Sequence, residues 1–280
     1  MALLLDPLLS PEQRARVFLI AVLLLPVLRV AIWGWVRRGR YSCLQCIFLF
    51  WAMLLTRILW RAQVPPWPLP PGQGAVLVAN HRSSIDPFFV QIQAPRPMHW
   101  MVAREYCDHP LLGPLLRISP VIRTNRSGVD TAATKTAIRL AAKGGVVGMF
   151  PEGRINMTDQ LLLPGRPGAV LVALKARVPL VPCFISGSPY GGSAGSPFLM
   201  RAKVTVRFGE LIDLAPYFGR EDEDGLVGEL MLRALRAIAD LAGREDFQPQ
   251  LAGRRWRPTP EEVERAANAL RQRGTEKHAG

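Results

Sequence analysis

A histidine and an aspartate five positions apart are the residues of this chain best suited to chemistry. His81 and Asp86 lie in AVLVANHRSSIDPFF, residues 75–89, where an apolar run ends abruptly in a polar turn. A carboxylate that accepts a hydrogen bond from one ring nitrogen fixes the tautomer of a histidine. The other ring nitrogen can then take a proton from a substrate hydroxyl. This spacing indicates a general-base pair, although a lone histidine at the end of a strand is usually a hydrogen-bonded turn residue.

The local elements that position this pair can be predicted from the same stretch. Residues 76–79 are expected to form a buried strand, and a helix is expected to begin near Ser84 and to continue to about Gln93. Ser83 or Ser84 would be its N-cap, and Pro87 is tolerated in a first helical turn. His81 would then lie at the carboxyl end of a strand.

Two further polar clusters also follow predicted strands. Asn125 and Arg126 come after residues 120–124, and Glu152-Gly153-Arg154 comes after residues 146–150. Ligands of open α/β sheets bind beyond the carboxyl ends of the strands, so the clusters can converge on one pocket. Arg126 and Arg154 would then bind phosphate, for which the planar guanidinium is suited. Glu152 would contact an acceptor hydroxyl or shape the site, whereas each cluster taken singly is an ordinary turn.

Strands and helices alternate through the rest of the chain. This order predicts an α/β fold with a largely parallel or mixed central sheet flanked by helices. The expected strands are residues 76–79, 99–103, 120–124, 146–150, 179–186 and 203–208, and the main helices are residues 84–93, 129–143, 168–177, 226–241 and 260–273.

Composition indicates contact with a membrane. The 280 residues carry a net charge of +13, hydrophobic residues make up 49%, and mean hydropathy is +0.13. Such a charge suggests an anionic partner, and lipid headgroups are favoured over nucleic acid because no nucleic-acid reader motif is present. An arginine-rich genome would produce the same bias. The four cysteines form no metal or disulfide framework, and Cys43 and Cys46 are expected to be free thiols in a helix.

Two apolar segments precede the strand of the His-Asp pair. Residues 17–36 are long enough to span a bilayer only marginally, and residues 41–56 are too short. Arginines flank both segments, which favours two helices lying in one leaflet over a spanning hairpin, with both arrangements left open. The predicted organisation is a membrane-associated two-helix motif (1–63), a Pro-rich linker (64–74), an α/β domain (75–250) and a charged tail (251–280).

Four motifs, taken together and in order, resemble one enzyme family. The motifs are NHRSSIDP at residues 80–87, VIRTNR at 121–126, FPEGR at 150–154 and VPLVPCFI at 178–185. They resemble the glycerolipid acyltransferases typified by 1-acylglycerol-3-phosphate (lysophosphatidate) acyltransferase. Two positions depart from the usual family pattern, namely Arg123 in the second motif and Arg154-Ile155 in the third.

The resemblance implies a reaction and a set of site residues. His81 and Asp86 would be the catalytic pair, and substrate would be bound by Asn80, Arg126, Glu152, Gly153 and Arg154. A fatty acyl group would pass from acyl-CoA or an acyl-carrier protein, as co-substrate, to the free hydroxyl of a lysophospholipid. The favoured acceptor is 1-acylglycerol-3-phosphate, and a lysophosphatidylethanolamine-like lipid or a lyso-aminolipid is the alternative. No metal or other cofactor is implied, and the catalytic domain would lie on the cytoplasmic face of the inner membrane among membrane phospholipids.

Two other functions compete with this interpretation. GGSAG, residues 191–195, matches the G-x-S-x-G pattern of serine hydrolases, whose nucleophile needs a strand directly before it and a helix directly after it. Ser193 instead lies in a Gly- and Pro-rich stretch that predicts a loop. A non-catalytic lipid-binding protein would also account for the basic, apolar front end, but lipid binding does not require the His81–Asp86 pair.

Overall fold

The computed structural model describes most of the α/β part of the chain. The described residues are 10–13, 15–16, 19–20, 22, 24, 41–108, 113–125, 130–253, 256, 259–262, 264–265 and 268. The chain divides into two compact units, Met1–Trp51 and Ala52–Gly280. All elements of the sheet belong to the second unit.

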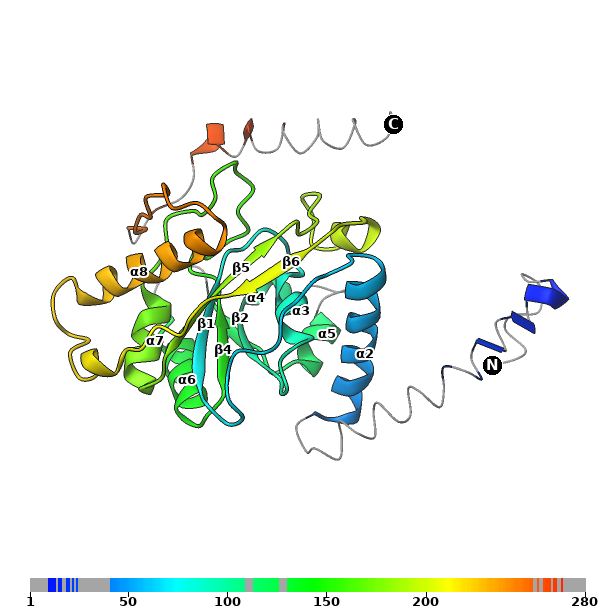
Figure 1. Ribbon diagram of the computed structural model, residues 1–280, viewed down its shortest axis with the longest axis horizontal. Coiled ribbons are helices and arrows are strands. Elements are labelled where there is room, and N and C mark those ends of the chain that lie inside the picture. Colours follow the sequence, from blue (N-terminus) through cyan, green and yellow to red (C-terminus); the bar gives the residue numbers. More distant parts are fainter. Residues whose placement is uncertain are drawn as a thin grey trace. The chain divides into compact units, whose positions relative to one another are not determined.

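A six-stranded mixed sheet forms the centre of this second unit, in the order β3-β2-β4-β1-β5-β6 (Figure 1). The strands are β1 (Ala75–Ala79), β2 (His99–Ala103), β3 (Ile122–Thr124), β4 (Val146–Met149), β5 (Leu180–Ser186) and β6 (Thr205–Phe208). Neighbouring strands are parallel except for β6, which pairs antiparallel with β5 at one edge. The α/β fold and the six strands expected from the sequence are confirmed.

Helices lie between the strands along the chain. They are α3 (Asp86–Gln91), α4 (Arg104–Cys107), α5 (Gly113–Ile118), α6 (Thr131–Ala142), α7 (Gly168–Ala176) and α8 (Leu226–Leu241), with short 3-10 turns η2 (Ser196–Leu199) and η3 (Ala215–Tyr217). An additional helix, α2 (Cys43–Ile58), precedes the sheet. Because β1 and β4 are neighbours, the turns that follow these two strands emerge at the same edge of the sheet.

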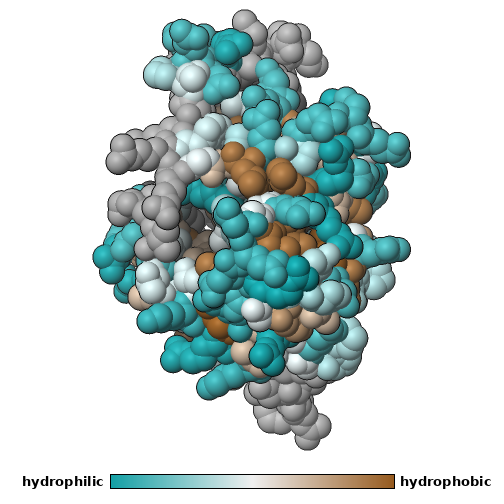
Figure 2. Space-filling view, turned by 90° about the vertical axis from the view of Figure 1, so that its left-hand side faces the viewer, coloured by the Kyte–Doolittle hydropathy of each residue, from teal (hydrophilic) through white to brown (hydrophobic). Residues whose placement is uncertain are grey.

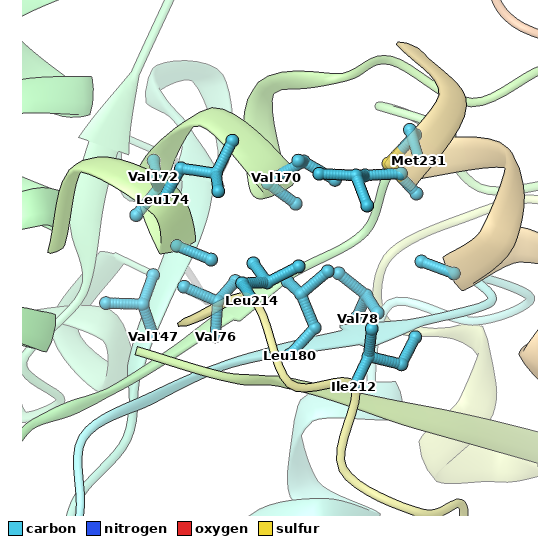
Figure 3. Packing of buried hydrophobic residues seen from close by; sticks show 14 of the residues in the cluster. Val76, Val78, Val147, Val170, Val172, Leu174, Leu180, Ile212, Leu214 and Met231 are labelled. Atoms are coloured by element: carbon cyan, nitrogen blue, oxygen red, sulfur yellow. The ribbon is translucent and has the colours of Figure 1, made fainter. Parts of the chain in front are cut away.

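Alternate residues of the central strands pack into two separate cores. Val76, Val78 and Leu180 face α6, α7 and α8, where they meet residues such as Val170 and Met231 (Figure 3). The intervening residues, such as Leu77 and Val181, pack on the other face against α3 and the segment around Trp60. Since β1 is fully buried on both faces, its sequence reads as a continuous apolar run.

The surface over α7 and α8 is largely polar. In the view of Figure 2 this face is mostly hydrophilic, and apolar atoms form smaller patches between hydrophilic side chains. The helices beneath it bury their apolar residues inward, as α8 does with Leu230, Leu235 and Ile238. The apolar periodicity of residues 226–241 therefore corresponds to the inner side of an outer helix.

The start of α3 differs from the expected one. The helix begins at Asp86 with Ile85 as its N-cap residue, no side chain caps it, and Pro87 lies in its first turn. Ser83 and Ser84, the expected caps, donate their hydroxyls elsewhere, to the carbonyls of Pro189 and Ala194. The carboxylate of Asp86 instead collects backbone N–H groups of the preceding turn, which leaves the serines available for these long-range bonds.

The front of the chain is described only in part. The second predicted apolar segment is the helix α2, and the first lies mostly outside the described residues. Within the part that is described, no helix combines the length and apolar character that crossing a bilayer requires. The predicted helix at 260–273 likewise lies largely outside the described residues.

Candidate active site

The predicted pair meets directly at the carboxyl end of β1. The Nδ1 atom of His81 lies 3.0 Å from Oδ2 of Asp86. The aspartate side chain is completely buried, and the histidine side chain is 16% exposed. A carboxylate can only accept a hydrogen bond, so Nδ1 carries the proton in the neutral ring and Nε2 is the basic nitrogen. This tautomer is the one a general base requires.

Asp86 also organises the turn that carries the histidine. Its Oδ2 atom accepts hydrogen bonds from the backbone N–H groups of Arg82 (2.7 Å) and Ser83 (2.8 Å). Its Oδ1 atom is buried without a hydrogen-bond partner among the described residues. One carboxylate oxygen therefore closes the turn and orients the ring at the same time.

The backbone of His81 is held on both sides by the turn that follows β4. Its N–H donates to Oε1 of Glu152 (2.7 Å), and its carbonyl accepts from the N–H of Asn156 (2.6 Å). The second oxygen of Glu152 accepts from the N–H of Leu163 (2.9 Å). Glu152 and His81 are brought together although they lie 71 positions apart in the chain.

Glu152 is a buried carboxyl with a shifted pKa. Its side chain is only 1% exposed. Burial raises its pKa from the ordinary 4.5 to about 8, against the opposing effect of the N–H donors of Leu163 and His81. Both of its oxygens contact backbone groups, so in this structure Glu152 joins the third motif to the first.

Asn80 makes a two-point contact between β1 and β5. Its amide nitrogen donates to the carbonyl of Ile185 (2.8 Å), and its amide oxygen accepts from the N–H of Ile185 (2.7 Å). Asn80 is 1% exposed. Its polar atoms are thus bonded to the neighbouring strand, where they hold the residue before the histidine in place.

Gly153 and two arginines lie beside Glu152. Gly153 has a φ of +69°, a conformation that other residues rarely adopt. The guanidinium of Arg166 lies against it, since a Cβ atom at position 153 would be 3.4 Å from Nε of Arg166. This Nε is buried and has no hydrogen-bond partner among the described residues. Arg154 follows directly in the turn and is half-buried.

The second polar cluster is only partly described. Arg126 lies outside the described residues. Asn125 is exposed at the end of β3, and its backbone N–H donates to Asp130 (2.9 Å), the residue that caps α6. Because β2 lies between β3 and β4, the backbone of Asn125 lies about 10 Å across the sheet from the turn that carries Glu152.

Three residues at this site were missed by the sequence reasoning. Asn156 accepts from the N–H and hydroxyl of Thr158, and Arg82 donates to the carbonyls of Thr158 (2.7 Å) and Gln160 (3.3 Å). These bonds shape the turn after Glu152. The Asn-x-Thr spacing is a local signal for such a turn, but nothing in the sequence indicates the contacts of Arg82 and Arg166.

The surroundings of Ser193 do not form a hydrolase nucleophile turn. β5 ends at Ser186, several residues earlier, and Ser193 is exposed in a loop that leads into a 3-10 turn. Its carbonyl accepts from the hydroxyl of Ser196. The strand-turn-helix that presents a nucleophilic serine is therefore absent around this residue. Within the described ranges, no group of three His, Cys, Asp or Glu side chains could hold a metal ion.

Comparison with known proteins gives a consistent result. Residues 64–186 match the family model described as Acyltransferase. A 1-acyl-sn-glycerol-3-phosphate acyltransferase of Limnanthes douglasii is 33% identical over 137 residues, which is 48% of each chain. One from Bacillus subtilis (strain 168) is 27% identical over 150 residues, covering 53% of this chain and 72% of that protein. The chain thus spans about half the length of the plant relative it matches.

A solved structure supports the same fold. The 1-acyl-sn-glycerophosphate acyltransferase PlsC from Thermotoga maritima superimposes with a TM-score of 0.52 and 20% sequence identity, covering 85% of both chains. The matched region 64–186 contains β1 to β5 and the turns that bring His81, Asp86 and Glu152 together. Over this region, the chain is similar to the Acyltransferase family model and to these 1-acyl-sn-glycerol-3-phosphate acyltransferases.

Proposed function

We propose that this protein transfers a fatty acyl group from an acyl thioester to the free hydroxyl of a lysophospholipid, with 1-acylglycerol-3-phosphate as the acceptor. The observation that carries the proposal is the 3.0 Å contact between His81 Nδ1 and the buried carboxylate of Asp86. The motifs that resemble glycerolipid acyltransferases surround this pair, and the relatives named above share the region. Acyl-CoA and acyl-carrier protein are the two candidate donors.

The reaction follows from the orientation of the histidine. Nε2 of His81 takes the proton of the acceptor hydroxyl as the oxygen attacks the thioester carbonyl. The carbon–sulfur bond breaks when the tetrahedral intermediate collapses, and the thiolate takes the proton from the imidazolium. Asp86 keeps the ring in the required tautomer and stabilises the imidazolium between the two steps. General-base assistance of this kind contributes roughly 10²–10⁴-fold to a rate.

The acceptor's phosphate would be bound by arginines. Arg154 lies in the turn after Glu152, and Arg166 lies against Gly153 with a buried Nε that has no partner in the described part of the chain. Arg126, from the end of β3, would complete this phosphate site. A guanidinium offers a planar set of donors that matches phosphate oxygens. Asn80 and Glu152 would act by positioning His81, because their polar atoms contact backbone groups.

We also propose that α2 associates with the cytoplasmic face of a membrane, where the acceptor lipid lies. Residues spaced three and four apart share one side of a helix. Along α2 this spacing collects exposed apolar residues, with exposed fractions from 37% to 70%: Leu44, Ile47, Trp51, Leu54 and Ile58. Such a side suits the boundary between headgroups and acyl chains, and the positive net charge suits anionic lipid.

The proposal is tested by assaying purified protein with a matrix of acyl donors and lyso-acceptors. Products would be resolved by mass spectrometry, which identifies donor and acceptor together. His81→Ala should reduce acyl transfer by about 10²-fold or more, because the general base is lost. Ser193→Ala should retain activity, which separates this reaction from serine hydrolysis.

Binding to phosphatidylglycerol vesicles distinguishes the proposed enzyme from a non-catalytic lipid-binding protein. His81→Ala should bind vesicles as the wild type does. A wild-type protein that binds vesicles but transfers no acyl group from any donor in the matrix would contradict the proposed reaction, as would substantial acyl transfer by His81→Ala.

A further inference from the structure

His81 is the last of three aromatic rings that form a stack. His81 follows β1, Phe150 follows β4, and Trp100 lies within β2. The imidazole ring of His81 lies parallel to the ring of Phe150, with 3.9 Å between centroids and 9° between planes. Phe150 in turn stacks on Trp100, with 5.1 Å between centroids and 18° between planes. We name His81, Phe150 and Trp100 the aromatic column.

Parallel stacking sets the column apart from five other aromatic pairs of the described residues. These pairs, such as Trp60 with Phe89 and Trp67 with Phe208, meet edge to face, with 60° to 82° between their planes. Neutral aromatic rings prefer edge-to-face or offset packing, because the negative faces of two rings repel each other. A cation is instead attracted to such a face. The face of Phe150 therefore attracts the imidazole of His81 more strongly when that imidazole is protonated.

Trp100, the third member of the column, holds Phe150 in this position. Trp100 of β2 lies level with Gly148 of β4. Its indole lies directly over that glycine, since a Cβ atom at position 148 would come 2.5 Å from the indole Cε3. The ring of Trp100 is therefore placed across β4, beneath Phe150, only because position 148 has no side chain.

The packing of Trp100 shows which part of its side chain matters. Trp100 is 4% exposed, and its Nε1 is buried without a hydrogen-bond partner among the described residues. Buried indole N–H groups usually have a partner. The ring is thus held by its faces rather than by its polar atom, so another aromatic ring should be able to replace it.

From this arrangement we infer that Phe150, supported by Trp100, is a positioning residue for His81 that stabilises its protonated ring. The inference rests on the proposed function in assigning His81 as the base, and it deepens that assignment. When His81 takes the proton of the acceptor hydroxyl, the imidazolium lies between the carboxylate of Asp86 and the face of Phe150. The ring face adds to the stabilisation by the carboxylate and restricts rotation of the imidazole.

The test is the titration of His81 in Phe150→Leu, measured by NMR on protein with ¹⁵N-labelled histidine. The chain has four histidines, and the His81→Ala variant identifies the signal of interest. Loss of the ring face should lower the titration midpoint by about half a pH unit, the shift that corresponds to a weak cation–π contact. Phe150→Tyr keeps a ring in the stack and should restore the wild-type midpoint.

Two matched comparisons separate the column from general packing. Phe208→Leu removes a half-buried ring that meets Trp67 edge to face, and it should leave the midpoint unchanged. Trp100→Leu should lower the midpoint, whereas Trp100→Phe should not. An unchanged midpoint in Phe150→Leu would overturn the inference, and so would a shift in Trp100→Phe as large as in Trp100→Leu.

The same variants give a kinetic readout. In Phe150→Leu the acidic limb of the pH profile of kcat/KM should move to lower pH by the same half unit, and kcat on the plateau should fall by about tenfold as the base loses alignment. The NMR titration does not depend on the reaction. If the wild type is inactive on every thioester but Phe150→Leu still shifts the titration midpoint, the proposed function is overturned and the inference about the aromatic column stands.

Discussion

Glu152 shows how one side chain can join two distant motifs. It accepts from the N–H of His81 with one oxygen and from the N–H of Leu163 with the other, in a site where the side chain is 1% exposed. A buried carboxyl keeps its proton to higher pH than an exposed one, because burial disfavours the charged form. This is the cause of its pKa of about 8.

This pKa predicts a pH dependence of stability. Between an unfolded value of 4.5 and a folded value of about 8, the folded state holds a proton that the unfolded chain releases. The stabilisation that this proton gives to the folded state is therefore complete below about pH 4.5 and is lost as the pH rises through about 8. The free energy of unfolding, from urea titrations at several pH values, should fall across this interval, and Glu152→Gln should flatten the fall.

The control for this prediction is Glu223→Gln. Glu223 is exposed and bonded to Arg220, which lowers its pKa, so its titration lies below the interval. The variant should keep the wild-type slope. Equal slopes in Glu152→Gln and the wild type would refute the role assigned to burial.

At the scale of elements, the junction between β1 and β5 determines where His81 lies. The amide of Asn80 replaces one residue of strand pairing by bonding both backbone groups of Ile185. The hydroxyls of Ser83 and Ser84 then attach the turn to the loop after β5 through Pro189 and Ala194. The histidine is therefore carried by a turn that is bonded to two neighbouring segments.

Asn80→Ala should destabilise this junction. The substitution leaves the N–H and the carbonyl of Ile185 without their partner in a buried place, and each such group costs about 1–3 kcal/mol. We expect the free energy of unfolding in urea to fall by about 2–6 kcal/mol. Asn125→Ala, at an exposed position, should change it by less than about 0.5 kcal/mol. Similar losses in both variants would be incompatible with this role of Asn80.

For the whole molecule, the proposed function requires that a site at one edge of a sheet reach a lipid. The second unit contains the sheet and the site, whereas the exposed apolar residues of α2 begin in the first unit. A protein with a net charge of +13 is attracted to anionic headgroups, and this attraction weakens as salt is added. The apolar side of α2 would contribute the part of the binding that salt does not remove.

Replacing four residues of α2 with serine tests this division. The variant Leu44→Ser, Ile47→Ser, Leu54→Ser, Ile58→Ser should bind phosphatidylglycerol vesicles about 100-fold more weakly in sedimentation assays, because less apolar surface leaves water. Transfer to a water-soluble, short-chain acceptor should persist. The control variant replaces three exposed apolar residues outside α2 with serine, namely Leu199, Leu211 and Leu251. It should bind the vesicles as the wild type does. Unreduced binding by the α2 variant would exclude the helix as the lipid contact.

Much of the fold was readable from the sequence because its signals are local. The apolar run before Asn80 predicted a buried strand, and alternation of strands with helices predicted the α/β class. The five-residue spacing of His81 and Asp86 already implied contact across one turn, and the structure has that contact at 3.0 Å. Short-range geometry is set mainly by the residues themselves.

Only the tertiary structure decided how the site is held together. The order of strands makes β1 and β4 neighbours, and this places Glu152, Asn156 and Phe150 around His81. The tertiary structure also binds the hydroxyls of Ser83 and Ser84 to distant carbonyls, and Asp86 rather than either serine accepts the backbone N–H groups before α3. No local pattern specifies which strand lies beside which, because that choice depends on how two cores on opposite faces of the sheet are filled at once.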